Sequence, residues 1–508
     1  MINAPSKSKY FYFLGLFPLL CLVIYIWVWG LEDFYFVLDN AIHLVLAKEA
    51  GWNVVEHLRR EPHPPLFYAI LKLFMEIFGT RNPLMLRACS LLAGILAVVV
   101  SYFFGKKLTG SHWVGFVVAY LLVTSPLVTS LSQALRNYSL LLFLLLSIFL
   151  CLQEEKPVLK HWIVLAFLIL LSTFTHYSSI LLLPSYLFLF FSKPITKWHK
   201  IKQSPLQLVW VFFLIANAFL TYGMVMIRPD STSGEDTHIA SLKSVVGQDI
   251  FRLGPVLWFF LKEVFGNNTS WLVACLGGWG FIRLIVERKR DLIILTVGPV
   301  LIGILFSLTN SYPMTSERHS IYLVPSILIA IIWGLKWFKI KNSASIAIIF
   351  ALILGTQFFS DFNVYKIKRD RDGRFFELGP RFSELKSVKS KLMQNGPNET
   401  IIFDASFYSG IWMEKILKPE WSIFLDVPQK LESSPIWFGI TEPKGRFCTS
   451  IQKLTKEYNR TKFLLFLRKE QTSSFRKYAL ADNHCYQIRD EIELSPNFVI
   501  VPLKSISN

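Results

Sequence analysis

Two adjacent carboxylates, Glu32 and Asp33, follow directly after the first long apolar segment of the chain. A carboxylate beside a bound substrate can take the proton of an attacking hydroxyl or amine, which makes it a general base. A pair can divide this work, with one residue acting as the base and the other holding a metal ion or the acceptor. The alternative is a wetted helix end, since carboxylates are common at a membrane boundary when they are solvated.

A second motif, Glu61 to Tyr68 with the sequence EPHPPLFY, places His63 immediately before two prolines. Prolines restrict their own backbone and that of the preceding residue, so the direction of this imidazole is constrained. A histidine held in this way can contact a phosphate or bind a metal ion. Two carboxylates and one histidine permit a divalent metal ion without requiring one. The alternative for His63 is a loop histidine without a role.

Basic and aromatic side chains recur later in the chain, at the ends of apolar segments. Arg136 and Tyr138 lie in the sequence SLSQALRNY, His176 lies in THYS, and Arg318 lies in SERHS. A guanidinium group can hold a phosphate through two parallel hydrogen bonds. Each of these residues also has a simpler interpretation, since Arg side chains extend to lipid headgroups and Tyr and His side chains occur at membrane interfaces.

These residues must be positioned by helices in a membrane. The 508 residues are 53% hydrophobic and only 17% charged, which is too little charge to cover a soluble protein of this size. Apolar runs of about 20 residues match a hydrocarbon core about 30 Å thick. We therefore expect a polytopic α-helical membrane protein with about eleven spans, the first retained as a helix. The expected spans are 11–30, 83–104, 112–131, 136–153, 161–176, 178–192, 207–227, 269–286, 292–309, 320–338 and 343–360.

The distribution of basic residues predicts the orientation of these spans. The net charge is +18, from 53 Lys and Arg against 35 Asp and Glu. We attribute this excess to short loops on one side of the membrane and not to nucleic-acid binding, since Lys and Arg clusters follow every second expected span. Such clusters can also attract anionic lipids. The N-terminus is then cytoplasmic, the C-terminal region is extracytoplasmic, and all the candidate residues named above lie on the outer side.

Outside the spans, the sequence predicts three larger segments. The first outer loop, 31–82, is expected to contain amphipathic helices at 34–48 and 66–78. The loop 228–268 is either a mobile lid or a long surface loop. From residue 361 the composition changes, and we expect a soluble α/β domain at 361–508, separate from the membrane domain at 1–360. Cys448 and Cys485 could pair there in an oxidising compartment. The expected strands and helices are 401–403, 421–425, 462–467 and 498–501, and 380–394 and 449–458.

The order of the motifs resembles a known superfamily. The succession ED-FYF, PHPPLFY, the Arg in LRACSLLAGILAV, TSP, SQALRNY, THYS and ERHSIYLVP is similar to the GT-C membrane glycosyltransferases, over roughly residues 11–340. The nearest groups are the protein O-mannosyltransferases and the aminoarabinose transferases. The resemblance implies a polyprenyl-phosphate sugar donor, inversion at the anomeric carbon and no nucleotide sugar.

The resemblance also implies roles for individual residues. The acidic pair falls on Glu32 and Asp33 in reversed order, which leaves open which of them is the base. The basic residue before Pro-Pro falls on His63, and Arg136, Tyr138 and Arg318 match positions expected at the donor phosphate. His176 is a further substrate-binding candidate. An acidic residue usual two positions before Arg136 is Ala134 here, and this departure weakens the expectation of a metal site.

The expected function is therefore sugar transfer from a lipid-linked donor to a lipid, glycan or protein acceptor at the outer face of a bacterial inner membrane. Two alternatives from other classes are a flippase or transporter of lipid-linked sugars and a catalytically inactive membrane assembly subunit. A transporter would favour repeated halves with broken helices at matching positions, and the sequence has no such symmetry. An O-antigen ligase or polymerase would place its large catalytic loop late in the chain. The sugar and the acceptor are not predicted.

Overall fold

The structure is a computed structural model, and the chain in it divides into two compact units. Unit 1 comprises Met1–Trp29, Ala50–Phe74 and Arg87–Ile367, and unit 2 comprises Gly30–Glu49, Met75–Leu86 and Lys368–Asn508. The structure describes residues 17–28, 31, 36, 38–50, 52–54, 63–80, 82–154, 159–192, 204–226, 250–309, 318–337, 355, 382–395, 400–403, 417, 462–468, 486–488, 492–495 and 498–505.

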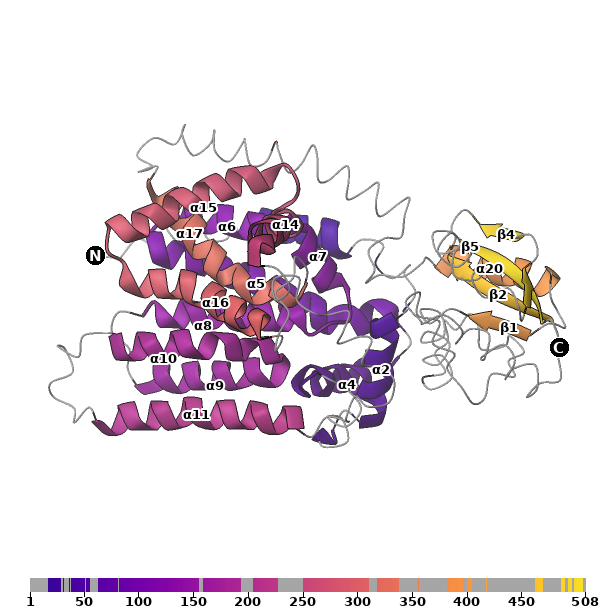
Figure 1. Cartoon of the computed structure of the whole chain (residues 1–508), viewed down its shortest axis with the longest axis horizontal. Helices are drawn as coiled ribbons and strands as arrows, with labels where there is room; N and C mark the ends of the chain where they lie inside the picture. Colours follow the sequence, from indigo (N-terminus) through magenta and orange to yellow (C-terminus); the bar gives the residue numbers. More distant parts are fainter. Residues whose placement is uncertain are drawn as a thin grey trace, which may run out of the picture. The chain divides into compact units, whose positions relative to one another are not determined.

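Helices account for nearly all of the described residues up to position 337 (Figure 1). Helices α8, α9, α10 and α11 lie side by side, and α15, α16 and α17 form a second group. Their bounds are η1 (Ile24–Val28), α2 (Leu38–Ala50), α4 (Leu66–Phe78), α5 (Pro83–Thr109), α6 (His112–Val123), α7 (Pro126–Gln133), α8 (Tyr138–Leu152), α9 (Leu159–Thr175), η3 (Tyr177–Leu182), α10 (Leu183–Ser192), α11 (Ser204–Met226), η5 (Ile250–Arg252), α14 (Leu253–Phe265), α15 (Thr269–Val286), α16 (Arg290–Leu308), η6 (Arg318–Leu323) and α17 (Val324–Trp337).

The chain is an integral membrane protein. Among the described residues, four helical segments are long and apolar enough to cross a membrane, namely Pro83–Thr109, Thr269–Val286, Arg290–Leu308 and Arg318–Trp337. The bent pair α6 and α7 adds a fifth if it is one span. Shorter apolar helices occupy Phe17–Val28, Tyr138–Leu152, Lys160–Thr175, Tyr177–Leu189 and Val209–Met224. The first ten expected spans thus fall on apolar helices, the span 343–360 lies almost entirely outside the described residues, and the count of eleven stays a prediction.

One expected span is interrupted. The sequence predicted a continuous span over 112–131, but α6 ends at Val123 and α7 begins at Pro126 with a bend of 62°. Pro126 has no N–H to continue the α6 ladder, and it suits the first turn of a new helix. Ser125 adopts an extended backbone, and its hydroxyl accepts a hydrogen bond from the N–H of Val128. The expected span therefore consists of two helices, because Ser125 and Pro126 together form a helix start.

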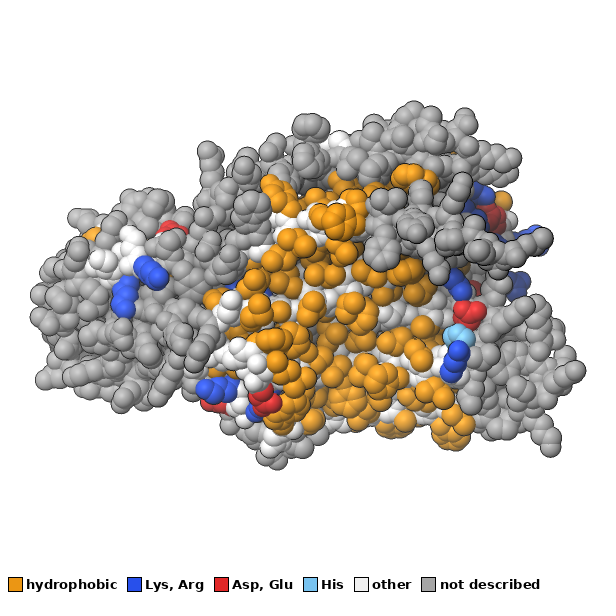
Figure 2. Space-filling model, turned by 180° about the vertical axis from the view of Figure 1, so that it is seen from behind, with side chains coloured by type: hydrophobic (Ala, Val, Ile, Leu, Met, Phe, Trp, Pro, Cys, Tyr) orange, Lys and Arg blue, Asp and Glu red, His pale blue; other side chains and the backbone are white. Residues whose placement is uncertain are grey.

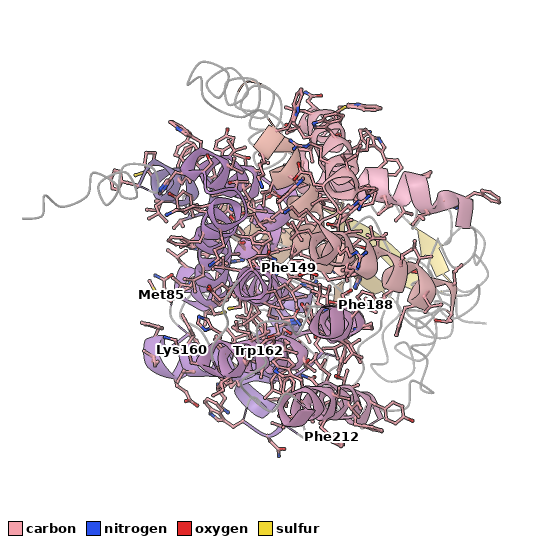
Figure 3. All side chains as sticks on the ribbon, turned by 90° about the vertical axis from the view of Figure 1, so that its left-hand side faces the viewer. Met85, Phe149, Lys160, Trp162, Phe188 and Phe212 are labelled. Atoms are coloured by element: carbon pink, nitrogen blue, oxygen red, sulfur yellow. The ribbon has the colours of Figure 1, made fainter. Side chains whose placement is uncertain are left out.

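The exterior and interior of unit 1 differ as a bilayer requires. Figure 2 shows a broad hydrophobic surface with charged side chains at its margins. Phe212 of α11 lies at the edge of the bundle and is 67% exposed, whereas Phe149 of α8 lies in the interior and is fully buried (Figure 3). Apolar side chains therefore face outward as well as inward, which is the arrangement expected where lipid replaces water as the solvent.

Glycines allow neighbouring segments to pack closely, as Gly94 and Gly280 show. A Cβ atom at Gly94 of α5 would collide with Ser132 of α7 and with the Trp27 ring of the first helix. A Cβ atom at Gly280 of α15 would collide with the backbone of Ala330 and Gly334 in α17. Close backbone approach of this kind is a usual source of packing energy between membrane helices.

The two larger expected loops contain helices. Helix α4 confirms the helix expected at 66–78, and α2 corresponds to the one expected at 34–48. The described part of the loop 228–268 consists of η5 and α14, so its second half is a helix that packs on α7 and α15.

The described C-terminal residues form one helix and a mixed sheet. The elements are α20 (Phe382–Asn395), β1 (Thr400–Phe403), β2 (Lys462–Arg468), β3 (Tyr486–Ile488), β4 (Ile492–Ser495) and β5 (Phe498–Ser505). Strand β1 pairs in parallel with β2, and β5 pairs antiparallel with β2, β3 and β4. The expected elements at 401–403, 462–467, 498–501 and 380–394 are thus present. The segments 421–425 and 449–458, Cys448 and Cys485 lie outside the described residues, and the domain boundary at 360/361 stays a prediction.

The close approach of α15 and α17 yields a stability prediction. Gly280→Ala forces the backbones of these two helices apart, so we expect the free energy of unfolding to fall by about 1–3 kcal/mol. Gly278→Ala, on the same helix with no atom within 4 Å of the new methyl group, serves as the control. The measurement is the thermal unfolding midpoint in detergent micelles. Equal midpoints for the two variants would contradict the close contact between α15 and α17 at Gly280.

Candidate active site

The candidate residues lie where helices stop or start. Helix α7 ends before Arg136 and α8 begins at Tyr138, α9 ends before His176, and η6 begins at Arg318. Element η6 packs against both α8 and η3, so these termini meet at one end of the bundle. The opposite end of α8 carries Glu154, whose carboxylate pairs with Lys107 at the C-terminus of α5 at 2.8 Å. The candidate site and this ion pair therefore lie at opposite ends of α8.

Hydrogen bonds tie the α7–α8 junction to three neighbouring segments of the chain. The amide of Gln133 donates to the carbonyl of Trp27 at 3.0 Å, and the amide of Asn137 donates to the carbonyl of Thr175 at 2.8 Å. The hydroxyl of Ser90 in α5 donates to the carbonyl of Arg136 at 3.2 Å. All of these groups are buried, and each would cost free energy if it lacked a partner in an apolar surrounding. These bonds therefore hold the segment before Tyr138 against α5, the first helix and the end of α9.

His176 is the residue that starts η3. Its backbone is extended, and Nδ1 of its imidazole accepts a hydrogen bond from the N–H of Ser178 at 3.1 Å. Because Nδ1 accepts, the neutral ring carries its proton on Nε2. The side chain is 3% exposed, so the ring is held in a defined orientation and tautomer inside the protein.

Four rings from separate parts of the chain form a row, which we call the ring row: His63, His176, Tyr138 and His319. The centroids of His63 and His176 lie 5.4 Å apart, those of His176 and Tyr138 lie 5.0 Å apart, and those of Tyr138 and His319 lie 6.3 Å apart. Tyr138 is buried, whereas His63 and His319 are half-buried. The structure thus brings together three residues predicted from the sequence, His63, Tyr138 and His176.

Cationic side chains adjoin the ring row in the sequence. Arg136 precedes Tyr138 by two residues and is 5% exposed, and Arg318 precedes His319. Arg87 is fully buried one turn before Ser90, which contacts the carbonyl of Arg136. Arginines buried in a membrane protein are costly and commonly serve a function.

Sequence reasoning did not assign roles to Arg87 or His319. Arg87 appeared only as the Arg of LRACSLLAGILAV. Its signal was a cation near the start of an apolar segment, and the signal for His319 was its position beside Arg318.

The predicted catalytic pair, Glu32 and Asp33, lies outside the described residues, so its role stays a prediction. No group of three or more His, Cys, Asp or Glu residues that could hold a metal ion occurs within the described part of the chain. Ala134, where the resembling families have an acidic residue, is fully buried, and its N–H donates to the carbonyl of Ser130. An acidic side chain at this position would therefore be buried as well.

Comparisons with known proteins bear on the family and on the fold. The family model of dolichyl-phosphate-mannose-protein mannosyltransferase matches residues 62–222, which include His63, Arg136, Tyr138 and His176. The resemblance to the GT-C superfamily is confirmed. A search of curated protein sequences gave no significant match to this chain.

Solved structures share the GT-C fold over nearly the whole chain. ArnT from Cupriavidus metallidurans in the apo state has a TM-score of 0.54 at 13% identity, covering 98% of both chains. ArnT bound to undecaprenyl phosphate has a TM-score of 0.52 at 11% identity, covering 96% of this chain and 98% of that one. The oligosaccharyltransferase AglB from Archaeoglobus fulgidus, in complex with an inhibitory peptide and a dolichol-phosphate, has a TM-score of 0.52 at 11% identity, covering 97% of this chain and 74% of that one.

Two substitutions at His176 separate the contribution of its hydrogen bond to Ser178 from that of its imidazole ring. Asn is a good helix-start residue, so His176→Asn keeps a cap but removes the imidazole from the ring row. His176→Ala removes both, and we expect it to cost about 1 kcal/mol of stability more than His176→Asn. The thermal midpoint of each purified variant checks this. If both variants unfold at the same temperature, the contact to Ser178 contributes nothing to stability.

Proposed function

We propose that this GT-C chain transfers a sugar from a polyprenyl-phosphate donor to an acceptor at the outer face of the membrane, with inversion at the anomeric carbon. The observation that carries the proposal is the ring row, in which three polar residues singled out from the sequence meet at one end of an apolar bundle. Independent interface anchors would have no reason to converge. The family model at residues 62–222 supports glycosyltransferase activity in general.

The donor phosphate is assigned to the arginines beside the ring row. We assign Arg136 and Arg318 to this role because they lie close in sequence to Tyr138 and His319, whose rings are in contact, and Arg87 adds a third guanidinium. Arginine suits phosphate because its planar group donates two parallel hydrogen bonds. The fold neighbours support a lipid phosphate, since one holds undecaprenyl phosphate and another holds a dolichol-phosphate and a peptide.

The acceptor is assigned a carboxylate base. Glu32 or Asp33 takes the proton from an acceptor hydroxyl or amine while the acceptor oxygen or nitrogen forms a bond to the anomeric carbon. The bond from that carbon to the phosphate oxygen breaks on the opposite face, and its electron pair leaves with the polyprenyl phosphate. Inversion follows from this single displacement. The reversed order of the pair keeps both residues as candidates for the base.

Two physical effects supply most of the rate in this proposal. Negative charge grows on the leaving phosphate, and preorganised guanidinium groups stabilise it more strongly in a water-poor site than in bulk water. Holding a membrane-bound donor and an acceptor together removes much of the entropic barrier. The tautomer of His176 adds an N–H donor at a fixed position, since its proton lies on Nε2. We place the active face outside the bacterial inner membrane, with a cytoplasmic N-terminus.

The acidic pair is tested by sugar release. Purified full-length protein in lipid is given a panel of radiolabelled polyprenyl-phosphate sugars, alongside Glu32→Gln, Asp33→Asn and the double variant. We expect turnover of one donor and a loss of about 100-fold or more in whichever single variant removes the base. The other single variant should retain most of the activity.

A wild-type protein that turns over no donor would contradict the proposal. If it binds a donor but turns over none of the panel with any acceptor supplied, the transferase proposal is wrong, and a flippase or an inactive assembly subunit is favoured. Transport of the bound donor across vesicles then separates these two alternatives.

Arg136 is tested by its effect on donor use. Arg136→Gln removes the charge, and Arg136→Lys keeps the charge but loses the planar fork. We expect kcat/KM for the lipid donor to fall about tenfold or more in both variants, with the larger loss in Arg136→Gln. Lys107→Gln, at the far end of α5, is the control and should leave kcat/KM unchanged. A loss in the control as large as in Arg136→Gln would point to general damage.

A further inference from the structure

Basic side chains gather at the C-terminal ends of α15 and α17, far from the ring row. Helix α17 continues the segment Arg318–Trp337, and the 20 residues of this whole segment place Lys336 about 30 Å from Arg318. Lys336 interacts electrostatically with Arg283, Glu287 and Lys289, so α15 and α17 end on the same side. The proposed donor site and this cluster therefore belong to opposite faces of the membrane.

The cluster has an excess of positive charge over a short distance. Arg283 pairs with Glu287 one turn later in α15. Arg288, Lys289 and Arg290 then follow in the turn between α15 and α16, and all three are exposed. With Lys336, the basic residues outnumber the acidic ones, which are Glu287 and Asp291. A phosphate group that binds here would meet an attractive field at close range.

Two of the cations are directed to one aromatic ring. The Lys336 ammonium lies 3.9 Å from the centroid of the Trp333 ring, and the Lys289 ammonium lies 5.9 Å from the same centroid. Trp333 is 3% exposed, and its indole N–H has no hydrogen-bond partner among the described residues. Two ammonium groups close to one another repel, and a bound anion would offset this repulsion.

Arg288 adopts a backbone conformation that is unfavourable for its side chain. Its φ angle is 51°, in the left-handed region, at the end of α15. The N–H of Lys289 donates to the carbonyl of Leu284, and the N–H of Arg288 donates to the carbonyl of Ile285, which is the pattern of a helix end that normally carries glycine. An arginine therefore occupies a position where glycine would be more stable. Backbone strain of this kind is common at functional positions, where the side chain has a role.

Apolar surface lies beside the basic turn. Trp279 and Trp337 contact each other edge to face at 5.3 Å and are 40% and 50% exposed. Ile282, Ile285 and Val286 of α15 are also exposed. Aromatic side chains of this kind lie at the level where acyl chains meet headgroups. The hydrophobic surface in Figure 2 likewise ends in Lys and Arg side chains.

We propose that the ends of α15 and α17 bind the headgroup of an anionic phospholipid in the leaflet opposite the donor site. Arg288, Lys289 and Lys336 contact its phosphates, and Trp279 and Trp337 contact its acyl chains. Three cations favour a phospholipid with two phosphates over one with a single phosphate. This site is independent of the proposed transferase chemistry.

The test measures lipid binding to the full-length protein. Delipidated protein in mild detergent is titrated with cardiolipin, phosphatidylglycerol or phosphatidylethanolamine, and bound lipid is counted by native mass spectrometry. We expect tightest binding of cardiolipin and weakest binding of phosphatidylethanolamine. The double variant Lys289→Gln, Lys336→Gln should bind cardiolipin about tenfold or more weakly. The control is Lys262→Gln, whose ammonium lies over the Trp258 ring beyond the other end of α15.

Arg288→Gly separates binding from folding. Glycine relieves the left-handed backbone, so the thermal midpoint should stay the same or rise while cardiolipin binding weakens. A merely structural arginine would lower the midpoint and leave cardiolipin binding unchanged. The proposal is overturned if the wild type binds phosphatidylethanolamine as tightly as cardiolipin, or if the double variant and Arg288→Gly bind cardiolipin as the wild type does.

Discussion

A helix that stops inside an apolar bundle leaves carbonyl and N–H groups without partners, and neither lipid nor apolar side chains can supply them. Several helices of this protein stop in that way around the candidate site. Gln133, Asn137 and Ser90 each reach across to a carbonyl of another element. The indole N–H of Trp27 does the same for the carbonyl of Val123, at the end of α6. Three of these bonds hold the segment that carries Arg136 and leads into Tyr138.

The same constraint explains why the site is built from residues far apart in the sequence. Each broken helix end needs a partner from a neighbouring element, so the partners and the ends are drawn to one place. His176 combines both tasks, because its Nδ1 caps η3 and its ring lies against Tyr138. Polar side chains within an apolar body thus arise as a by-product of ending helices there.

Most helices and several site residues could be predicted from the sequence because the patterns that indicate them are local. Apolar runs located the helices, and Pro64 and Pro65 before α4 singled out His63. The break between α6 and α7 was missed, although Ser125 and Pro126 carried it, because the apolar pattern on both sides is uninterrupted. His319 and Arg87 could not be ranked, since their burial and ring contacts depend on packing between distant segments. The roles of Glu32 and Asp33 stay predictions from motif order.

The helices beside the site are short for a bilayer. Helix α8 has 15 residues and α9 has 17, so they extend about 22 and 25 Å, whereas a typical hydrocarbon core is about 30 Å thick. Hydrophobic mismatch of this size is relieved when the surrounding lipid thins or when flanking residues extend toward the interface. Thinning next to α8 and α9 would lower the headgroup layer toward Tyr138 and His176. A lipid phosphate would then reach the depth of the ring row with its chains still in the membrane, so the short helices themselves would ease substrate access.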